Sequence, residues 1–202
     1  TEYVAKAAPD GYTMLWIIAN HTTNHLLFKV SYDPIKDFAP VGQFVSVPLM
    51  MASNPSFPAK SVKDLIALAR VKPGQINYAS SGIGGFNHFG GELFKVAASV
   101  DMTHVPYKGS GAVYPDLMAG RVNFLFDLAG SAMGFIQGGK VRALATTSSR
   151  RSAALPDVPT IAESGFPGFE FGAYLAVFAP AATPREAIAI LERSKEKFEF
   201  PV

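Results

Sequence analysis

Short apolar runs of the kind that form buried strands alternate with amphipathic helical segments along most of this chain. The run at residues 75–80, for example, is followed at residues 84–99 by apolar side chains spaced as on one face of a helix. Strands that alternate with helices of this length are typical of βαβ units, so we predict an α/β fold with a largely parallel sheet. The expected strands are residues 14–19, 45–52, 75–80, 103–105, 122–126, 141–146 and 174–178, and the expected helices are residues 62–71, 84–99, 114–119 and 131–137.

The predicted elements fall into one complete set and two flanking pieces. Residues 53–171 contain a full α/β unit, whereas residues 1–52 and 172–202 are each too small to fold alone. We expect the two flanks to combine into one further lobe. The strands at residues 45–52 and 174–178 would then carry the chain across twice, which predicts two lobes with a cleft between them.

Two local features support the predicted helices. Ser61 and Asp64 have the spacing of a capping box, which predicts a helix beginning at Val62. Gly90 and Gly91 stand inside the helix at 84–99, where each costs about 1 kcal/mol relative to alanine. We expect a close approach of this helix to the sheet to explain the two glycines.

The composition excludes several classes of function. The 18 Lys and Arg residues nearly balance 16 Asp and Glu residues, and no basic run is longer than Arg150–Arg151. A nucleic-acid-binding surface needs a basic stripe, so we expect no nucleic-acid partner. The chain contains no cysteine, which excludes thiol chemistry, disulfides and cysteine-based zinc sites.

Membrane insertion is also not expected. The uncharged stretch at residues 38–59 is long enough to span a bilayer, but four prolines interrupt it. A membrane helix there would leave backbone groups unsatisfied, so we interpret the chain as soluble. The first residues do not resemble a secretory signal peptide, and we expect any such peptide to have been removed.

A small, glycine-rich turn follows the strand at residues 75–80 and opens the next helix. The free N–H groups at a helix start, together with the helix dipole, can bind an anion. Ser80 and Ser81 would add hydroxyl donors, and Gly82, Gly84 and Gly85 would let a ligand approach the backbone. A plain strand–helix turn is an equal alternative. The turn is neither a dinucleotide fingerprint nor a phosphate-binding P-loop.

Other polar residues follow other predicted strands. Tyr107 and Lys108 precede Gly109 in a second glycine-containing turn, and Asp127 ends a third strand. Ligands of open α/β sheets lie outside the carboxyl ends of strands, so these side chains are candidates for ligand contact. The alternatives are a solvated surface role for Lys108 and a cap or loop brace for Asp127. Residues 19–25, after the first strand, are also rich in hydrogen-bonding groups.

Metal binding and catalysis are weakly supported. His21 and His25 are four residues apart, but no acidic partner lies nearby, so we expect no metal site. Ser81, His88 and Asp127 supply the residue types of a hydrolase triad without a nucleophile elbow around any serine. We expect a structural hydrogen bond for His88, no cofactor and no enzymatic activity.

Six sequence stretches together resemble one protein family. The chain is similar to the solute-binding proteins of tripartite tricarboxylate transporters, the Bug or TctC-like family, from about residue 4 to residue 191. The stretches occur in the family's order: residues 5–13 (AKAAPDGYT), 32–38 (YDPIKDF), 78–82 (YASSG), 91–94 (GELF), 105–109 (VPYKG) and 155–163 (LPDVPTIAE).

The resemblance implies a periplasmic-binding-protein fold of type II, a Venus flytrap of two α/β lobes. It implies a periplasmic protein that captures a small carboxylate, such as a dicarboxylate, tricarboxylate, amino acid or aromatic acid. The membrane components of a transporter would be its partners. In the family, loops of both lobes clasp the carboxylate, largely through backbone amides and water.

The resemblance also implies which residues bind the ligand. The expected ligand-binding residues are Ser80, Ser81, Gly82, Gly84 and Gly85 in the first turn, Tyr107, Lys108, Gly109 and Asp127 at neighbouring strand ends, Asn20, Thr22 and Thr23 after the first strand, and Tyr174 on the second crossing strand.

The chain departs from the family pattern in three ways. Gly85 stands where the family usually has threonine, and Leu128 stands where it often has asparagine, so with Phe86 close by we expect a less polar ligand than a tricarboxylate. Family members also begin with a further strand–loop–helix unit and continue with more helix beyond residue 191. We therefore expect a truncated chain with an incomplete first lobe.

Two other functions are consistent with the same residues. A ligand-sensing module would present the same fold to a receptor. A serine hydrolase would act through Ser81, against the weak triad geometry described above.

Overall fold

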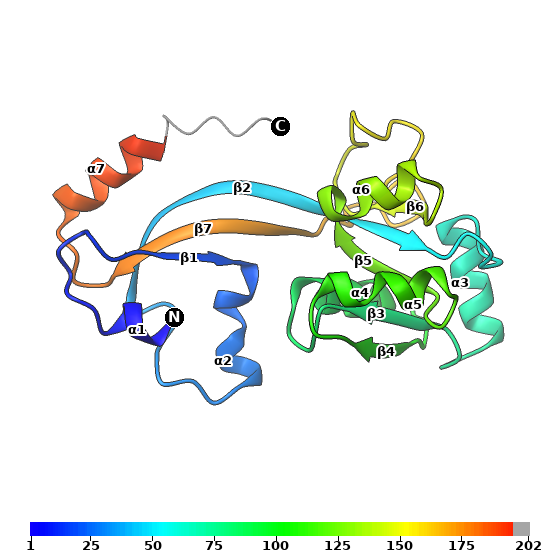
Figure 1. Ribbon diagram of the computed structural model, residues 1–202, viewed down its shortest axis with the longest axis horizontal. Coiled ribbons are helices and arrows are strands. Elements are labelled where there is room, and N and C mark those ends of the chain that lie inside the picture. Colours follow the sequence, from blue (N-terminus) through cyan, green and yellow to red (C-terminus); the bar gives the residue numbers. More distant parts are fainter. Residues whose placement is uncertain (196–202) are drawn as a thin grey trace. The chain divides into compact units, whose positions relative to one another are not determined.

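Two units make up the chain in the computed structural model, which describes residues 1–195 (Figure 1). Unit 1 contains Thr1–Ser46 and the chain from Tyr174 onward, and unit 2 contains Val47–Ala173. The chain passes between the units within two long strands, β2 (Phe38–Ser53) and β7 (Gly172–Pro180). Residues 196–202, which the sequence analysis assigned to the first lobe, lie outside the described residues.

Unit 2 contains most of the predicted strands and helices. Its strands lie in the order β6-β2-β5-β3-β4. They are the end of β2 with β3 (Asn77–Ser80), β4 (Thr103–Pro106), β5 (Phe124–Leu128) and β6 (Arg142–Thr146). The helices are α3 (Val62–Val71), α4 (Phe86–Ala98), the 3-10 turn η2 (Ser110–Ala112), α5 (Tyr114–Met118) and α6 (Ala129–Gln137). Each expected strand and helix of this unit is confirmed, with ends shifted by a few residues.

The sheet of unit 2 is mixed rather than largely parallel. β3 runs parallel to β4 and to β5, as predicted. β2, however, runs antiparallel to both β5 and β6, so the largely parallel sheet that we predicted is not found. The reason is topological: β2 enters the sheet directly from unit 1 and is not the product of a helical crossover, which is the connection that makes neighbouring strands parallel.

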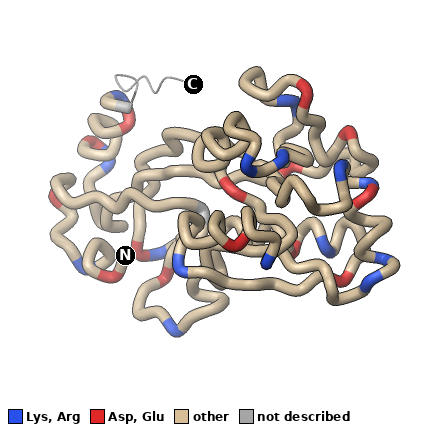
Figure 2. The backbone as a smooth tube through the Cα atoms, turned by 45° about the vertical axis from the view of Figure 1, so that its right-hand side comes forward, with Lys and Arg blue, Asp and Glu red and all other residues tan. Residues whose placement is uncertain are grey.

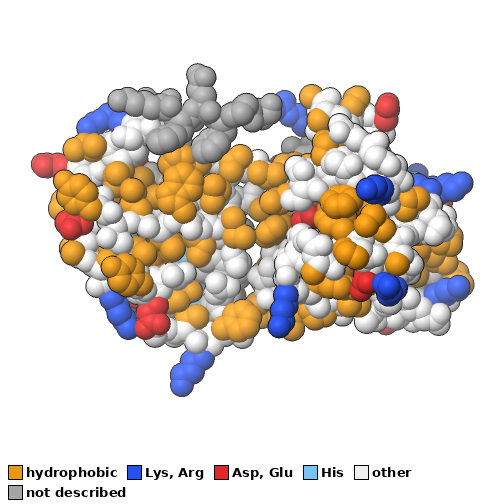
Figure 3. Space-filling view, in the orientation of Figure 1, with side chains coloured by type: hydrophobic (Ala, Val, Ile, Leu, Met, Phe, Trp, Pro, Cys, Tyr) orange, Lys and Arg blue, Asp and Glu red, His pale blue; other side chains and the backbone are white. Residues whose placement is uncertain are grey.

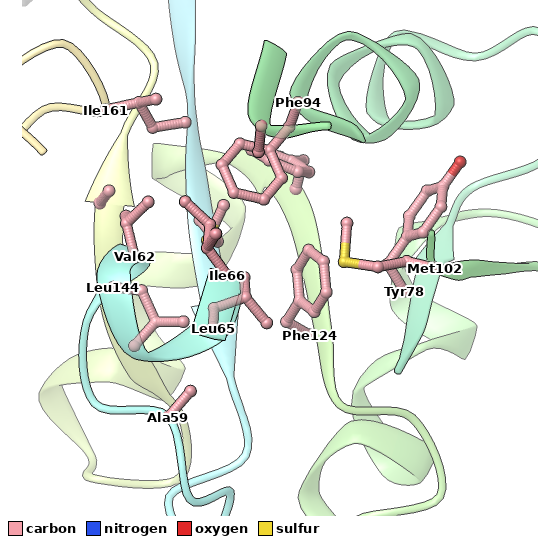
Figure 4. Packing of buried hydrophobic residues seen from close by; sticks show 14 of the residues in the cluster. Ala59, Val62, Leu65, Ile66, Tyr78, Phe94, Met102, Phe124, Leu144 and Ile161 are labelled. Carbon is pink, nitrogen blue, oxygen red and sulfur yellow. The ribbon is translucent and has the colours of Figure 1, made fainter. Parts of the chain in front are cut away.

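The core of unit 2 forms where helices cover the sheet. α3 begins as expected, because the Ser61 hydroxyl accepts the N–H of Asp64 at 3.1 Å. Its apolar stripe then packs Leu65 against strand residues such as Phe124 (Figure 4). The fully buried members of this cluster include Leu49, Met51, Leu65, Tyr78, Phe94 and Phe124.

The two glycines inside α4 permit close packing against the sheet. A Cβ atom on Gly91 would lie closer than 3.0 Å to three atoms of the Tyr78 ring. One on Gly90 would lie 2.9 Å from the end of the Leu49 side chain. The close approach predicted from the sequence is therefore confirmed.

Unit 1 is built from short elements around small apolar clusters. β1 pairs antiparallel with β7, and the 3-10 turn η1 follows β1. Besides the start of β2 and most of β7, the elements of this unit are α1 (Glu2–Ala5), β1 (Leu15–Ile18), η1 (Ala19–Thr22), α2 (Asn24–Leu27) and α7 (Arg185–Lys195). Many large apolar side chains on this unit are exposed (Figure 3), including Tyr3, Tyr12, Trp16, Leu26 and Ile35.

Two findings bear on the excluded classes of function. Lys and Arg residues are interspersed with Asp and Glu along the described chain and form no basic stripe (Figure 2). Within residues 1–195, none of the helices combines the length and the apolar character that a bilayer crossing requires.

Candidate functional site

Two loops of unit 2 are joined by their backbones at the ends of neighbouring strands. Because β3 and β4 are adjacent and parallel, the loops that follow them begin at the same edge of the sheet. The N–H of Tyr107 donates to the carbonyl of Ser80 at 3.0 Å, and the N–H of Gly109 donates to the carbonyl of Ser81 at 3.0 Å. We call the joined loops, residues 80–85 and 107–109, the loop platform.

Glycine is required at several positions of the loop platform. Gly84 has a φ angle of +78° and Gly109 has one of +96°, in the left-handed region that side chains disfavour. A Cβ on Gly82, whose φ angle is +140°, would lie 3.4 Å from the carbonyl oxygen of Tyr107. The glycines therefore let both loops adopt backbone conformations that a side chain would disfavour.

The start of α4 borders the loop platform. Its N-cap residue is Gly85, and no side chain caps the helix. The first N–H groups of an α-helix have no intrahelical partners, so those of α4 can bind an external acceptor. The hydroxyl of Ser81 does not cap the helix but donates to Oδ1 of Asn87. The adjoining Ile83 is 59% exposed, so this part of the platform faces solvent.

Asp127 lies near the carboxyl end of β5, the strand next to β3, with an exposed fraction of 1%. Its Oδ1 accepts hydrogen bonds from Asn87 at 3.2 Å and Ser110 at 2.9 Å, and its Oδ2 accepts one from Tyr114 at 2.9 Å. Burial raises the pKa of Asp127, against the opposing effect of these hydrogen bonds. Both carboxylate oxygens are thus engaged within unit 2, and they connect β5 to α4, η2 and α5.

In the second loop, the side chain of Tyr107 is hydrogen-bonded within unit 2, whereas that of Lys108 is exposed to solvent. The hydroxyl of Tyr107 donates to Asp116 at 2.7 Å, and burial together with Asp116 raises the pKa of Tyr107 to about 12. Lys108 is exposed. Of the two, Lys108 presents a charged group to solvent beside the platform.

Two histidine rings support the loop platform from one side. Nδ1 of His88 accepts the N–H of Gly84 at 3.3 Å, which is the structural hydrogen bond expected for this residue. Nε2 of His104 lies 2.6 Å from the hydroxyl oxygen of Ser80. The two rings stack with centroids 4.1 Å apart.

Four residues that form hydrogen bonds at or next to the platform were not predicted from the sequence. They are Asn87, His104, Ser110 and Tyr114. Asn87 carried the one usable signal, since a polar residue on the buried side of a predicted helix needs hydrogen-bond partners. The other three lie in parts of the chain whose neighbours depend on the pairing of β3, β4 and β5.

The remaining predicted residues lie in unit 1. The hydroxyl groups of Thr22 and Tyr174 lie 3.5 Å apart, and the hydroxyl of Thr23 donates to the carbonyl of Asn20 at 3.2 Å. Oδ1 of Asn20 is buried and has no hydrogen-bond partner among the described residues. Unit 1 therefore places Thr22 next to Tyr174, and Thr23 next to Asn20.

His21 is a structural residue of unit 1. It is fully buried among the rings of Tyr32, Phe38 and Phe178, and its Nε2 lies 3.1 Å from the carbonyl of Pro34, to which it donates. In the described range, no group of three or more His, Cys, Asp or Glu residues is arranged to hold a metal ion.

Comparisons with sequences give one consistent family. A family model described as "Tripartite tricarboxylate transporter family receptor", TctC, matches residues 1–199. The chain is 36% identical over 199 residues to a "UPF0065 protein in tcbD-tcbE intergenic region" of Pseudomonas sp. (strain P51), covering 98% of this chain and 59% of that protein. It is 35% identical over 196 residues to "Protein BugT" of Bordetella pertussis, covering 96% and 60%. The chain thus spans about 60% of the length of these relatives.

Solved structures show the same fold. A structure described as "R. palustris Rpa4515 with adipate" has a TM-score of 0.85 and 39% identity, covering 96% of this chain and 65% of that one. The "periplasmic binding protein BugD" gives 0.82 and 35%, with coverage of 96% and 65%. "MatC (Rpa3494) from Rhodopseudomonas palustris with bound malate" gives 0.83 and 33%, with coverage of 96% and 67%. The described residues therefore have an α/β periplasmic-binding-protein fold.

Proposed function

This chain belongs to the tripartite tricarboxylate transporter receptor family, TctC, and from that premise we propose that it is part of a periplasmic solute-binding protein that captures a small carboxylate for a transporter. The membrane components of that transporter are its proposed partners. The finer architecture, a type II Venus flytrap of two lobes joined by two crossing strands, is proposed for the whole protein on the same ground.

The observation that carries the proposal is the loop platform beside the uncapped start of α4. Backbone N–H groups there lie at the positive end of a helix dipole, where an anion is favoured. A hydrogen bond to a charged group contributes about 1.5–3 kcal/mol net, so a few such bonds suffice for micromolar binding, about 8 kcal/mol. The exposed ammonium of Lys108 adds a positive charge at the same edge.

The predicted residues take different roles in this proposal. The N–H groups of Phe86, Asn87 and His88, in the first turn of α4, supply donors to the carboxylate, and Lys108 supplies charge. The N–H groups of Gly82, Gly84 and Gly85 already donate to Ser80, His88 and Gly82, so these glycines shape the turn that the carboxylate approaches. Asp127 acts indirectly, by fixing Asn87 and Ser110, since its oxygens already have partners. The polar groups of unit 1, which include the unpartnered Asn20 Oδ1, are a second proposed set of ligand contacts.

The ligand class follows from relatives and from local polarity. The titles of two solved relatives report bound adipate and bound malate, both dicarboxylates. Gly85 adds no hydroxyl to the platform, and Phe86 and Leu128 are apolar neighbours of its polar groups. We therefore place a dicarboxylate with a short apolar chain first among the candidate ligands.

A hydrolytic function is not supported by the site. The Ser81 hydroxyl donates to Asn87 and not to an imidazole, and Nδ1 of His88 accepts a backbone N–H. Ser80, which does contact an imidazole, is fully buried. Neither Ser80 nor Ser81 therefore has both an activating base and access to a substrate.

A thermal-unfolding screen tests the proposal. The chain is heated with a panel of mono-, di-, tricarboxylic and aromatic acids, and the expected result is a higher melting temperature with at least one dicarboxylate. A ligand at a hundredfold excess over its Kd adds about 2.7 kcal/mol to the free energy of unfolding, which is readily measured. If no carboxylate raises the melting temperature of this chain or of a full-length relative carrying its residues 80–128, the proposal fails.

A further inference from the structure

Three aromatic rings form a stack against the loop platform. The rings of Tyr78 and His104 have centroids 4.9 Å apart, and those of His104 and His88 have centroids 4.1 Å apart, with 29° between the latter planes. The three residues come from β3, β4 and α4, so the stack joins the elements that carry both loops. Nothing in the proposed capture of a carboxylate uses these imidazoles directly.

Each histidine of the stack is bonded to one residue of the first loop. Nδ1 of His88 accepts the N–H of Gly84, so this nitrogen carries no proton in the observed arrangement. Nε2 of His104 lies 2.6 Å from the Ser80 hydroxyl, which itself lies 3.1 Å from both the N–H and the carbonyl of Gly82. The two rings thus fix the loop at its first residue and at Gly84.

The charged groups near the two imidazoles are one carboxylate, Glu92, and one ammonium, Lys95. Glu92 and Lys95, both on α4, form an ion pair 2.9 Å long, and Glu92 also accepts the Tyr78 hydroxyl at 2.5 Å. Burial lowers the pKa of His88, and Glu92 opposes this effect while Lys95 adds to it. Burial lowers the pKa of His104 to about 4, and the neighbouring His88 adds to the effect. Both rings are therefore uncharged at neutral pH.

We propose that His88 and His104 are positioning residues that hold the loop of residues 80–85 in its carboxylate-binding shape only while His88 is uncharged. The proposal rests on the proposed function for its consequence, but not for its geometry.

The two rings respond differently to a proton. A proton on Nδ1 of His88 would point at the N–H of Gly84, so the bond is lost and Gly84 turns away from it. A proton on Nε2 of His104 is tolerated, because the Ser80 hydroxyl can accept from it and donate instead to the Gly82 carbonyl. Acidification therefore disturbs the loop through His88, at a pH below the ordinary histidine value of 6.5.

The geometry is tested without any ligand. Two-dimensional ¹H–¹⁵N NMR spectra of the chain and of His88→Asn are recorded from about pH 7.5 to about pH 4.5, the span in which a histidine with a lowered pKa titrates. An asparagine oxygen can accept the Gly84 N–H but does not titrate. We expect the Gly84 signal to move with the His88 ring in the unmodified chain and to stay in place in the variant. A Gly84 signal that ignores the titration of His88, or moves equally in both proteins, overturns the proposal.

The consequence for capture is tested with adipate. Protonation of adipate itself weakens binding equally in both proteins, so the comparison isolates the protein. We expect the Kd to rise between neutral and acidic pH by about fivefold more in the unmodified chain than in His88→Asn, a coupling of ordinary size. An equal rise in both overturns the proposal. If adipate binds neither protein at any pH, the proposed function fails, and the Gly84 signal alone decides the positioning role.

A second variant, at His104, tests whether the two histidines have separate roles and does not depend on the folding of His88→Asn. His104→Gln places an amide near the position of Nε2, and we expect it to leave the pH response of Gly84 in place, since His88 remains. If His104→Gln abolishes the pH response of the Gly84 signal while the rest of its spectrum shows a folded protein, the separate roles given to the two rings are contradicted.

Discussion

At the scale of single residues, Asp127 is the group on which the site most depends. It is buried at the carboxyl end of β5, and three side chains from different segments donate to its two oxygens. The sequence indicated a polar residue at a strand end but not the direction of its carboxylate. The structure directs it into unit 2, where it accepts hydrogen bonds from Asn87, Ser110 and Tyr114.

Replacing Asp127 is expected to cost more stability than removing one of its donors. Asp127→Ala leaves the donors of Asn87, Ser110 and Tyr114 unsatisfied, at about 1–3 kcal/mol each where no water replaces the carboxylate. Tyr114→Phe removes one hydrogen bond and is expected to cost about 1 kcal/mol. Urea denaturation measures both. A loss for Asp127→Ala no larger than that for Tyr114→Phe would contradict the bracing role.

At the scale of elements, α4 links the core to the candidate site. Its first turn borders the loop platform, and its middle lies against the ring of Tyr78 and the side chain of Leu49. The absence of side chains at Gly90 and Gly91 sets how closely the helix approaches, and hence where its first N–H groups lie. The position of the site therefore depends on packing about one turn further along the helix.

Gly91→Ala is expected to destabilise the protein although alanine favours helices. Its methyl group would overlap the ring of Tyr78, which is fully buried, and overpacking of this kind costs about 1–3 kcal/mol. The matched control is Gly134→Ala in α6, where no atom lies within 4 Å of the added carbon and the gain is up to about 1 kcal/mol. Thermal denaturation compares the two. If both variants are stabilised, close packing does not explain the glycines of α4.

At the scale of the whole molecule, the two units differ in how much apolar surface they bury. The largest core clusters belong to unit 2 and include Tyr78, Phe94 and Phe124, whereas those of unit 1 are small. Unit 2 also contains the loop platform. We therefore expect the proposed carboxylate-binding groups of unit 2 to be held in place by the more extensive core.

The sequence predicted the elements well because their signals are local. Apolar spacing, the cap at Ser61 and the glycine turns act within a few residues, and the structure confirms the elements that they indicate. The expectation of a largely parallel sheet failed at β2, because strand pairing depends on the course of the entire chain. The contact of His104 with Ser80 was missed for the same reason, since it requires β3 and β4 to be neighbours.

Mapping adipate binding onto the backbone by ¹H–¹⁵N NMR tests the central claim most directly. The account predicts that the largest changes in chemical shift, as adipate is added, fall on the N–H groups of residues 82–88, at the turn and the first turn of α4. Saturable changes confined to other parts of the chain, with these N–H signals unmoved, would contradict it.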